Sequence, residues 1–312
     1  MIKFLPLFLS PIFCFALQPK DSLKREYKTK HVIVIIVDGP RYSETWGDSA
    51  HKYIPNMVKL SKKGIISTNF YNDKFTYTSS GHTAILTGYE QELENKKGTE
   101  LPNKPSYLQY YREKTQCDSY KVWLITSKDK LEILSNCKDS LYHNRYRPSV
   151  DCGNNGLGTG YRNDTITFNR CISVLEKDKP DLLFVNFREP DYSGHKKDWK
   201  GYLQGIRDTD SLVYLLYQYI NSNKHYKDNT TFCITNDHGR HLDNVKEGFC
   251  EHGDDCRGCK HINLFISSPD LKRNYISNKR YIQTDITATI AELLHLNMPY
   301  STGEIMWDYF KK

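Results

Sequence analysis

The chain has 312 residues, of which 44 are Lys or Arg and 37 Asp or Glu, so the formal net charge is +7; 38% are hydrophobic and 13% aromatic. A disordered chain is excluded, because a sequence so rich in Tyr, Phe and Ile buries enough apolar surface to fold. A multi-span membrane protein is excluded as well, since the mean hydropathy is −0.66 and only one long apolar run exists.

The one long apolar run lies at the N-terminus. Lys3 gives it a positive start, residues 4–16 are almost wholly apolar, and polar residues follow from Gln18. This run is too short to cross a bilayer, and its pattern is typical of a secretory signal peptide. We therefore predict a signal peptide over residues 1–16, one catalytic domain over 17–312, and a secreted or periplasmic protein. A buried N-terminal segment is the alternative.

Cysteine usage follows from the predicted export. Removal of Cys14 with the signal peptide leaves an even set of eight cysteines, which favours disulfides in an oxidising compartment. We predict disulfides for most of them and consider Cys233 a candidate for a buried free thiol. Cys250, Cys256 and Cys259 also suggest a zinc-finger-like site, but a fourth ligand at suitable spacing is missing and exported thiols tend to oxidise.

Short apolar runs alternate with helix-like stretches along the chain. The first run, His31–Val37, is apolar on both faces, as in a central parallel strand covered by helices. In chain order we expect strands at 31–37, 121–125, 181–187, 231–235 and 263–267, and helices at 54–63, 106–114, 166–176, 199–220 and 284–294. This alternation predicts an α/β fold with a doubly wound, mostly parallel central sheet and helices on both faces.

Carboxylates and imidazoles follow three of the expected strands. Ligands bind at the carboxyl ends of the strands in such sheets, so these side chains are expected at one edge. Carboxylate oxygens and imidazole nitrogens suit zinc, and six ligands are enough for two ions that each keep an open position. Singly, each motif also fits a helix cap, a turn or a surface ion pair. The six candidates are Asp38, Asp191, His195, Asp237, His238 and His252.

A cluster of hydroxyl residues supplies candidate nucleophiles. The segment 75–88 begins with Thr and Ser residues and ends in a helical pattern. A hydroxyl at a helix N-terminus lies where anions bind, because backbone N–H groups and the positive end of the helix dipole point there. A bound zinc ion makes such a hydroxyl easier to deprotonate, so that it can attack phosphorus. The alternative is a cluster of N-cap residues.

The order of these motifs resembles the alkaline phosphatase superfamily over nearly the whole mature chain. The stretch 78–82, Thr-Ser-Ser-Gly-His, is similar to the nucleophile motif of its threonine-nucleophile branch, which includes bacterial alkaline phosphatases and nucleotide pyrophosphatase/phosphodiesterases. The resemblance implies that Thr78, four residues before His82, is the nucleophile. Ser80 stands where that branch often has Pro. The segment 283–294 also resembles the closing helix of the superfamily.

The same resemblance implies how the candidate ligands are divided between two Zn²⁺ ions. Asp191, His195 and His252 would bind one ion. Asp38, Asp237 and His238 would bind the other, with Thr78 facing it. His261 competes with His252 for the last position, but His252 followed by Gly253 matches the family's pattern better.

The segment 126–130, Thr-Ser-Lys-Asp-Lys, follows the second expected strand. It resembles the Ser-x-Lys-Asp-Arg stretch of the threonine-type bacterial phosphatases, whose two cations hold the oxygens of a phosphate monoester. The resemblance implies that Lys128 and Lys130 bind phosphate. Lys130 stands in the place of Arg and would bind phosphate more weakly, because a lysine ammonium cannot form the paired hydrogen bonds of a guanidinium group. A solvated turn is the alternative. The family also supplies an Asn to the phosphate, for which Asn95 is our choice and Asn103 its competitor.

These motifs together predict an exported di-zinc phosphohydrolase that forms a phosphothreonine intermediate. A monoesterase is favoured, because a monoester dianion carries one more charge for the lysines to bind. A phosphodiesterase or nucleotide pyrophosphatase is the alternative, and a non-catalytic secreted binding protein is a third. A sulfatase is disfavoured, since no Cys/Ser-x-Pro-x-Arg sequence is present to make formylglycine.

The expected partner is a small phosphate ester. Nucleic acid is not expected, because the lysines are scattered without alternating aromatic residues. Stable membrane insertion is not expected once the signal peptide has been removed.

Overall fold

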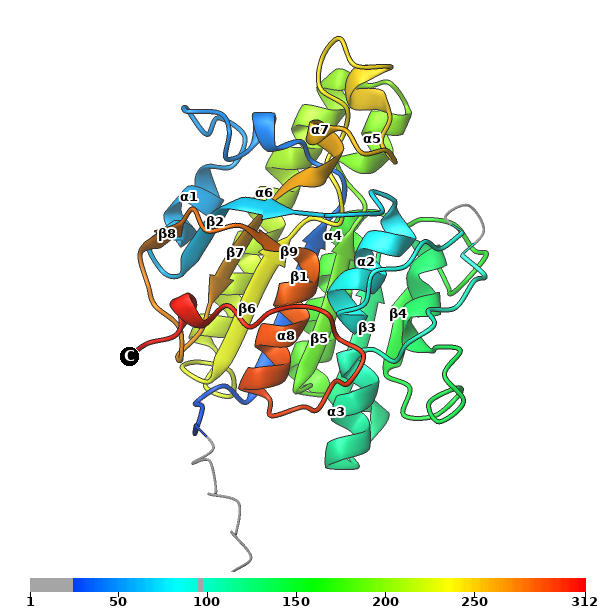
Figure 1. Cartoon of the computed structure of the whole chain (residues 1–312), viewed down its shortest axis with the longest axis vertical. Helices are drawn as coiled ribbons and strands as arrows, with labels where there is room; N and C mark the ends of the chain where they lie inside the picture. Colours follow the sequence, from blue (N-terminus) through cyan, green and yellow to red (C-terminus); the bar gives the residue numbers. More distant parts are fainter. Residues whose placement is uncertain (1–24, 95–97) are drawn as a thin grey trace, which may run out of the picture.

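The computed structural model describes residues 25–94 and 98–312 (Figure 1). The predicted signal peptide and Asn95 lie outside the described residues. In the part described, no helix is both long and apolar enough to cross a membrane.

A mixed sheet forms the centre of the molecule. Its strands follow the order β4-β3-β5-β1-β6-β7-β2-β8, with β9 also paired to β2. All pairs are parallel except those of β7, which runs antiparallel to β6 and β2. The strands are β1 His31–Val37, β2 Ile65–Tyr71, β3 Val122–Thr126, β4 Ser149–Cys152, β5 Leu182–Phe187, β6 Thr230–Thr235, β7 His261–Ser267, β8 Tyr275–Ser277 and β9 Tyr281–Ile282.

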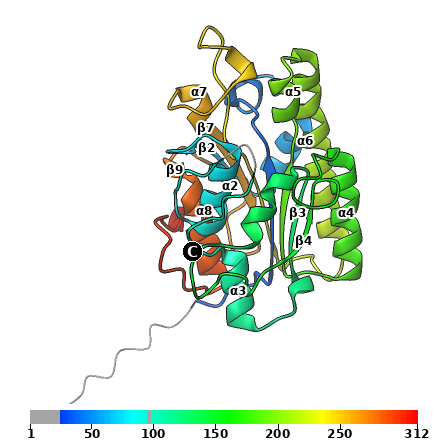
Figure 2. The ribbon, with the colours of Figure 1, turned by 90° about the vertical axis from the view of Figure 1, so that its right-hand side faces the viewer.

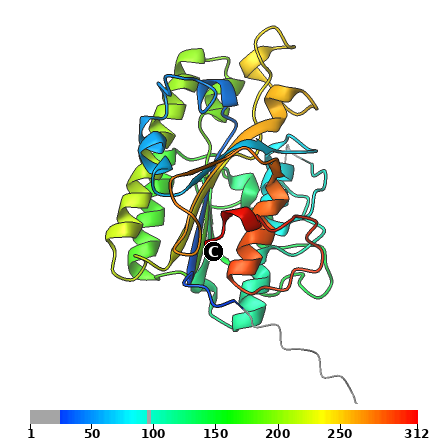
Figure 3. The same cartoon turned by 60° about the vertical axis from the view of Figure 1, so that its left-hand side comes forward.

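Helices cover both faces of the sheet (Figures 2 and 3). One face carries α2, α3 and α8, and the other carries α1, α4 and α6. The helices are α1 Pro55–Ser61, α2 Thr78–Thr87, α3 Tyr107–Thr115, α4 Asp164–Lys177, α5 Asp191–His195, α6 Trp199–Ser222, α7 Arg257–Lys260 and α8 Gln283–Leu293. The predicted fold class is confirmed.

The two faces of β1 explain why its sequence is apolar throughout. Val32, Val34 and Ile36 pack with residues of α2 and α8 in one core cluster. Ile33 and Ile35 point to the opposite face and pack with residues of α1 and α6 in the other. Successive side chains of a strand alternate between faces, so a strand covered on both sides needs apolar residues at every position.

Local sequence signals set the helix ends. α6 begins after Asp198, whose side chain accepts a hydrogen bond from the N–H of Gly201. α4 begins after Asn163, whose side chain caps the N–H of Thr165. α2 ends at Thr87 and is capped by Gly88, whose φ of 67° lies in the left-handed region that glycine adopts without strain. These capping residues set where the helices begin and end, and therefore where the loops that connect them to the strands lie.

Candidate active site

Four neighbouring parallel strands, β3, β5, β1 and β6, end at the same edge of the sheet. Asp38 directly follows β1, and Asp237 lies two residues beyond the end of β6. Asp191 begins α5 shortly after β5, and Thr78 is the first residue of α2. The structure therefore brings the six predicted ligands and the predicted nucleophile together, as expected for the carboxyl edge of a parallel sheet.

Asp191, His195 and His252 form the first group of donor atoms. His195 Nε2 is 3.0 Å from His252 Nε2 and 3.3 Å from Asp191 Oδ1, and His252 Nε2 is 3.4 Å from the same carboxylate oxygen. Tetrahedral ligands that are each about 2.0–2.1 Å from zinc lie about 3.3 Å from one another. The spacing of the three atoms thus fits the zinc site that the resemblance implied.

Asp38, Asp237, His238 and Thr78 form the second group. His238 Nε2 is 3.6 Å from Asp38 Oδ1, 3.3 Å from Asp237 Oδ2 and 3.4 Å from Thr78 Oγ1. Those two carboxylate oxygens are buried and have no hydrogen-bond partner among the described residues. Because a buried unpaired carboxylate oxygen is costly, this donor set fits a cation between its members.

The tautomers of the two buried histidines are set by backbone carbonyls. His238 Nδ1 donates to the carbonyl of Gly239 at 2.9 Å, and His252 Nδ1 donates to the carbonyl of Thr76 at 2.7 Å. Each Nε2 is thereby left with a lone pair that faces the carboxylates. Burial lowers the pKa of His238 to about 4 and the pKa of His252 well below its ordinary value. Both imidazoles are therefore neutral at pH 7, as metal ligands must be.

Lys128 lies between the two groups of ligands. Its Nζ is 2.6 Å from Asp191 Oδ2, 2.9 Å from Asp38 Oδ2 and 3.3 Å from Thr78 Oγ1. The side chain is buried, so a solvated turn is excluded. Burial would lower the pKa of Lys128, but the charges of Asp191 and Asp38 outweigh burial and raise it. Lys128 is thus a fixed cation beside the predicted nucleophile.

The carboxylates that contact Lys128 have opposite pKa shifts. Burial, together with the charge of Asp237, raises the pKa of Asp38 well above its ordinary value. Burial also acts to raise the pKa of Asp191, but Lys128 and Arg240 outweigh it and hold that pKa well below the ordinary value. Of these two carboxylates, Asp38 is therefore the one whose negative charge is less well compensated by neighbouring cations.

The other predicted phosphate ligands differ in their surroundings. Lys130 is buried, and burial followed by the charge of Lys128 lowers its pKa to about 8. Asn103, the competitor of Asn95, is exposed, and its backbone N–H bonds the side chain of Gln91 at 2.8 Å. His261, the competitor of His252, stacks against Tyr42 and Tyr71 and is not part of either ligand group.

Three supporting residues were not predicted. Arg240 bonds both Oδ1 of Asp191, at 2.5 Å, and its carbonyl, at 3.0 Å. His82 Nδ1 is 2.8 Å from the carbonyl of Thr78 and 3.3 Å from Asp237 Oδ2. Asn186 donates to Asp38 Oδ2 at 3.0 Å. A signal existed for Asn186, because an amide within the apolar strand at 181–187 needs a polar partner.

Replacement of Arg240 is expected to weaken metal binding by roughly 10- to 100-fold, the usual effect of losing a group that orients a ligand. Arg240→Met removes the two bonds that hold Asp191 in place. The zinc dissociation constant, measured by competition with a chromogenic chelator, checks this. Arg170→Met, which changes a mostly exposed side chain, is the matched control and is expected to leave zinc affinity unchanged. Equal affinity of both variants would contradict a role for Arg240.

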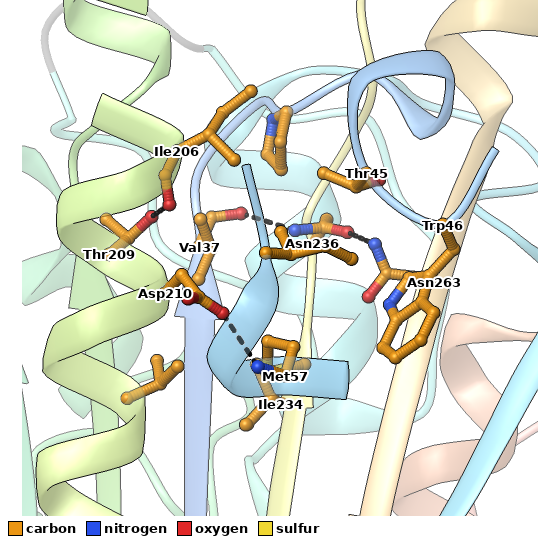
Figure 4. A pocket seen from close by; sticks show the side chains of 13 residues that line it. Val37, Thr45, Trp46, Met57, Ile206, Thr209, Asp210, Ile234, Asn236 and Asn263 are labelled. Carbon is orange, nitrogen blue, oxygen red and sulfur yellow. Dashed lines mark hydrogen bonds between the residues drawn. The ribbon is translucent and has the colours of Figure 1, made fainter. Parts of the chain in front are cut away.

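The amide side chains of Asn236 and Asn263 connect neighbouring strand ends (Figure 4). Asn236 donates to the carbonyl of Val37 at 2.9 Å and accepts a bond of 2.7 Å from Asn263, which links β1, β6 and β7. These residues line a pocket of about 30 Å³. Because such a volume holds about one or two waters, the pocket is too small for an ester substrate.

The predicted disulfides are not confirmed. All eight cysteines of the described residues are free. Three of them, Cys152, Cys171 and Cys233, are buried on β4, α4 and β6, so they belong to separate elements. Cys233 is the buried free thiol that the sequence suggested.

Comparison with known proteins finds one matching family and several solved structures of similar fold. The family model described as Sulfatase matches residues 30–296. A search of curated proteins finds no match. Among solved structures, murine ectonucleotide pyrophosphatase/phosphodiesterase 5 is similar at a TM-score of 0.66 and 13% identity, over 90% of this chain and 100% of that one.

Two bacterial structures are similar to about the same degree. A phosphonate monoester hydrolase from Silicibacter pomeroyi has a TM-score of 0.64 and 12% identity, over 89% of this chain and 76% of that one. A protein from a Bacteroides thetaiotaomicron study of glycosaminoglycan metabolism has a TM-score of 0.65 and 14% identity, over 89% of this chain and 81% of that one. At these identities the structures support the fold.

Proposed function

The chain belongs to the sulfatase family of the alkaline phosphatase superfamily, and on this premise we propose that it is an exported, two-zinc phosphate monoesterase with Thr78 as its nucleophile. Family membership agrees with the superfamily that the motifs predicted. The threonine-nucleophile branch, the two zinc ions and export are parts of the proposal. The observation that carries it is the position of Thr78 Oγ1, 3.4 Å from His238 Nε2 and 3.3 Å from Lys128 Nζ.

Thr78 has the surroundings that a nucleophile for phosphate needs. It is buried as the first residue of α2, where the first N–H groups of a helix lack intrahelical partners and attract anions. Zinc, when bound, would make the hydroxyl easier to deprotonate and would neutralise charge on the phosphoryl group. A threonine-to-alanine variant of the murine pyrophosphatase/phosphodiesterase is described as inactive and in complex with AMP, which supports a threonine in this role.

The reaction would proceed in two displacements at phosphorus. Thr78 Oγ1 gives up its proton and forms the new bond to phosphorus, while the ester oxygen leaves with its electron pair and takes up a proton as the alcohol, so that no proton is gained or lost overall. Water then attacks the phosphothreonine, which releases inorganic phosphate and regenerates the hydroxyl. Lys128 lies within reach of Oγ1 and holds positive charge where negative charge develops.

The residue type at the nucleophile position favours a phosphate ester over a sulfate ester as the substrate. The chain lacks a Cys/Ser-x-Pro-x-Arg sequence, so it lacks the signal for formylglycine formation. Two buried lysines, Lys128 and Lys130, also suit the dianion of a phosphate monoester. A diesterase is the second candidate, because burial and the charge of Lys128 lower the pKa of Lys130 to about 8. Above that pH Lys130 is mostly neutral, and a diester needs one positive charge fewer than a monoester dianion.

A substrate panel on one metal-analysed sample tests the proposal. Zinc-loaded protein is given an aryl phosphate monoester, an aryl phosphodiester and an aryl sulfate. The expected result is the highest kcat/KM for the monoester, activity lost on chelation and restored by zinc. A higher kcat/KM for the diester or the sulfate would assign the enzyme to that substrate instead. Zinc-loaded protein that turns over none of the three would favour a binding protein.

A further inference from the structure

A second cluster of metal-ligand residues lies beside the catalytic edge but shares no residue with it. His241, Asp254, Cys256 and Cys259 place one donor atom each within 4.8 Å of the other three. His241 belongs to the segment after β6. Cys256 directly precedes α7 and Cys259 lies within it, near the end of the molecule that also carries α5 (Figure 1). Four donors from two segments thus converge at one point.

The imidazole of His241 is buried and makes no hydrogen bond to another described residue. Its side chain is only 3% exposed, and neither ring nitrogen has a hydrogen bond within the part of the chain that the structure describes. Nε2 lies 3.2 Å from Asp254 Oδ2. A buried imidazole whose nitrogens make no hydrogen bond costs free energy. Binding of a cation by Nε2 removes this cost, so His241 itself indicates a ligand at the centre of the cluster.

The two cysteines are arranged as a metal-binding pair. Cys256 is the N-cap of α7, and its sulfur accepts a hydrogen bond from the backbone N–H of Cys259 at 3.3 Å. This turn holds the two sulfurs on one side, since residues three apart on a helix share a face. Both thiols are free, and Cys259 is fully buried. A Cys-x-x-Cys turn completed by two further ligands is the common form of a structural zinc site.

We propose that His241, Asp254, Cys256 and Cys259 bind a structural zinc ion, separate from the catalytic metals. The sequence alone offered Cys250, Cys256 and Cys259 and lacked a fourth ligand. The fold supplies His241 and Asp254 in place of Cys250. Zinc binding also explains how the two thiols would survive an oxidising compartment, because a coordinated thiolate pair is not free to form a disulfide.

The site would fix the loop that carries His252. Asp254 lies two residues after His252, and its carbonyl accepts a bond of 2.8 Å from Thr76 Oγ1. Gly239, which follows His238, donates its N–H to the carbonyl of Cys259 at 2.7 Å. A metal ion here therefore joins the segment after β6 to the loop that carries His252. It would help to position two catalytic-metal ligands, His238 on the first segment and His252 on the second.

Cobalt substitution of the full chain tests the proposal. Cobalt bound to thiolates gives a sulfur-to-metal charge-transfer absorption, whereas the nitrogen and oxygen ligands of the catalytic groups give none. We expect this band in the wild type and in Cys117→Ser, a control on a partly buried thiol elsewhere, and its loss in the Cys256→Ser/Cys259→Ser double variant. A wild type without the band, or a double variant that keeps it, would overturn the proposal.

A second measurement needs no variant and guards against misfolding of the double variant. An organomercurial added to zinc-loaded wild-type protein displaces zinc from thiolates, so about one zinc ion per chain should be released. Release of none would contradict the site. So would a Cys256–Cys259 disulfide found by mass spectrometry of the unreduced protein. Neither readout depends on turnover, so both are independent of the proposed phosphatase activity.

Discussion

Thr78→Ala is expected to lower kcat for an aryl phosphate monoester by roughly 10³-fold or more, as loss of a nucleophile does in other covalent enzymes. The substitution removes the only hydroxyl placed 3.4 Å from His238 Nε2 and 3.3 Å from Lys128 among the described residues. Steady-state kinetics on zinc-loaded protein checks this. Thr78→Ser, which keeps a hydroxyl, should retain part of the activity.

The neighbouring hydroxyl provides the matched control. Ser79 is buried in the same turn of α2, and Ser79→Ala is expected to keep most of the activity. Zinc content should be similar in both alanine variants, because Thr78 is one donor of four in its group. Full activity of Thr78→Ala, or loss of activity in Ser79→Ala alone, would move the nucleophile away from Thr78.

Lys128→Met is expected to destabilise the metal-free protein by about 3–5 kcal/mol, the usual cost of removing one partner of a buried ion pair. Met has a similar shape but leaves Asp38 and Asp191 without the ammonium that lies 2.9 and 2.6 Å from them. Zinc supplies positive charge to the same carboxylates, so added zinc should recover part of the loss. Urea unfolding with chelator and with zinc measures both effects.

An exposed lysine gives the comparison for this second variant. Lys138 pairs with Glu100 on the surface, and its side chain is 48% exposed. Lys138→Met should change the free energy of unfolding by about 0–1 kcal/mol, because solvent screens such pairs. If Lys128→Met were no more destabilising than Lys138→Met in chelator, Lys128 would not be the counter-ion of the ligand carboxylates.

The five expected strands are all present because each is a short run of buried apolar residues, which is a local signal. β1 starts and ends as predicted, and β5 and β6 differ by one residue at one end. β2 was not predicted, since Ser67, Thr68 and Asn69 interrupt its apolar residues. β8 and β9 span only three and two residues, too few for a pattern.

The candidate ligands could be predicted because each directly follows a strand or lies in a short motif. Arg240, which supports Asp191, could not be predicted, because a buried arginine has no sequence pattern of its own and depends on contacts between segments far apart in the chain. Likewise, His241 and Asp254 are brought to Cys256 and Cys259 by the path of the loop after β6. The position of Lys128 between the two carboxylates also depends on β1, β3 and β5 being neighbours.

Trapping of the covalent intermediate tests the central claim most directly. Zinc-loaded protein is mixed with an aryl phosphate monoester, quenched in acid during turnover, digested and examined by mass spectrometry. We predict one added phosphoryl group on the peptide that carries Thr78, located on Thr78 and absent from Thr78→Ala. Turnover of the monoester without any phosphorylated peptide, or with the phosphoryl group on Ser79 or Ser80, would contradict this assignment.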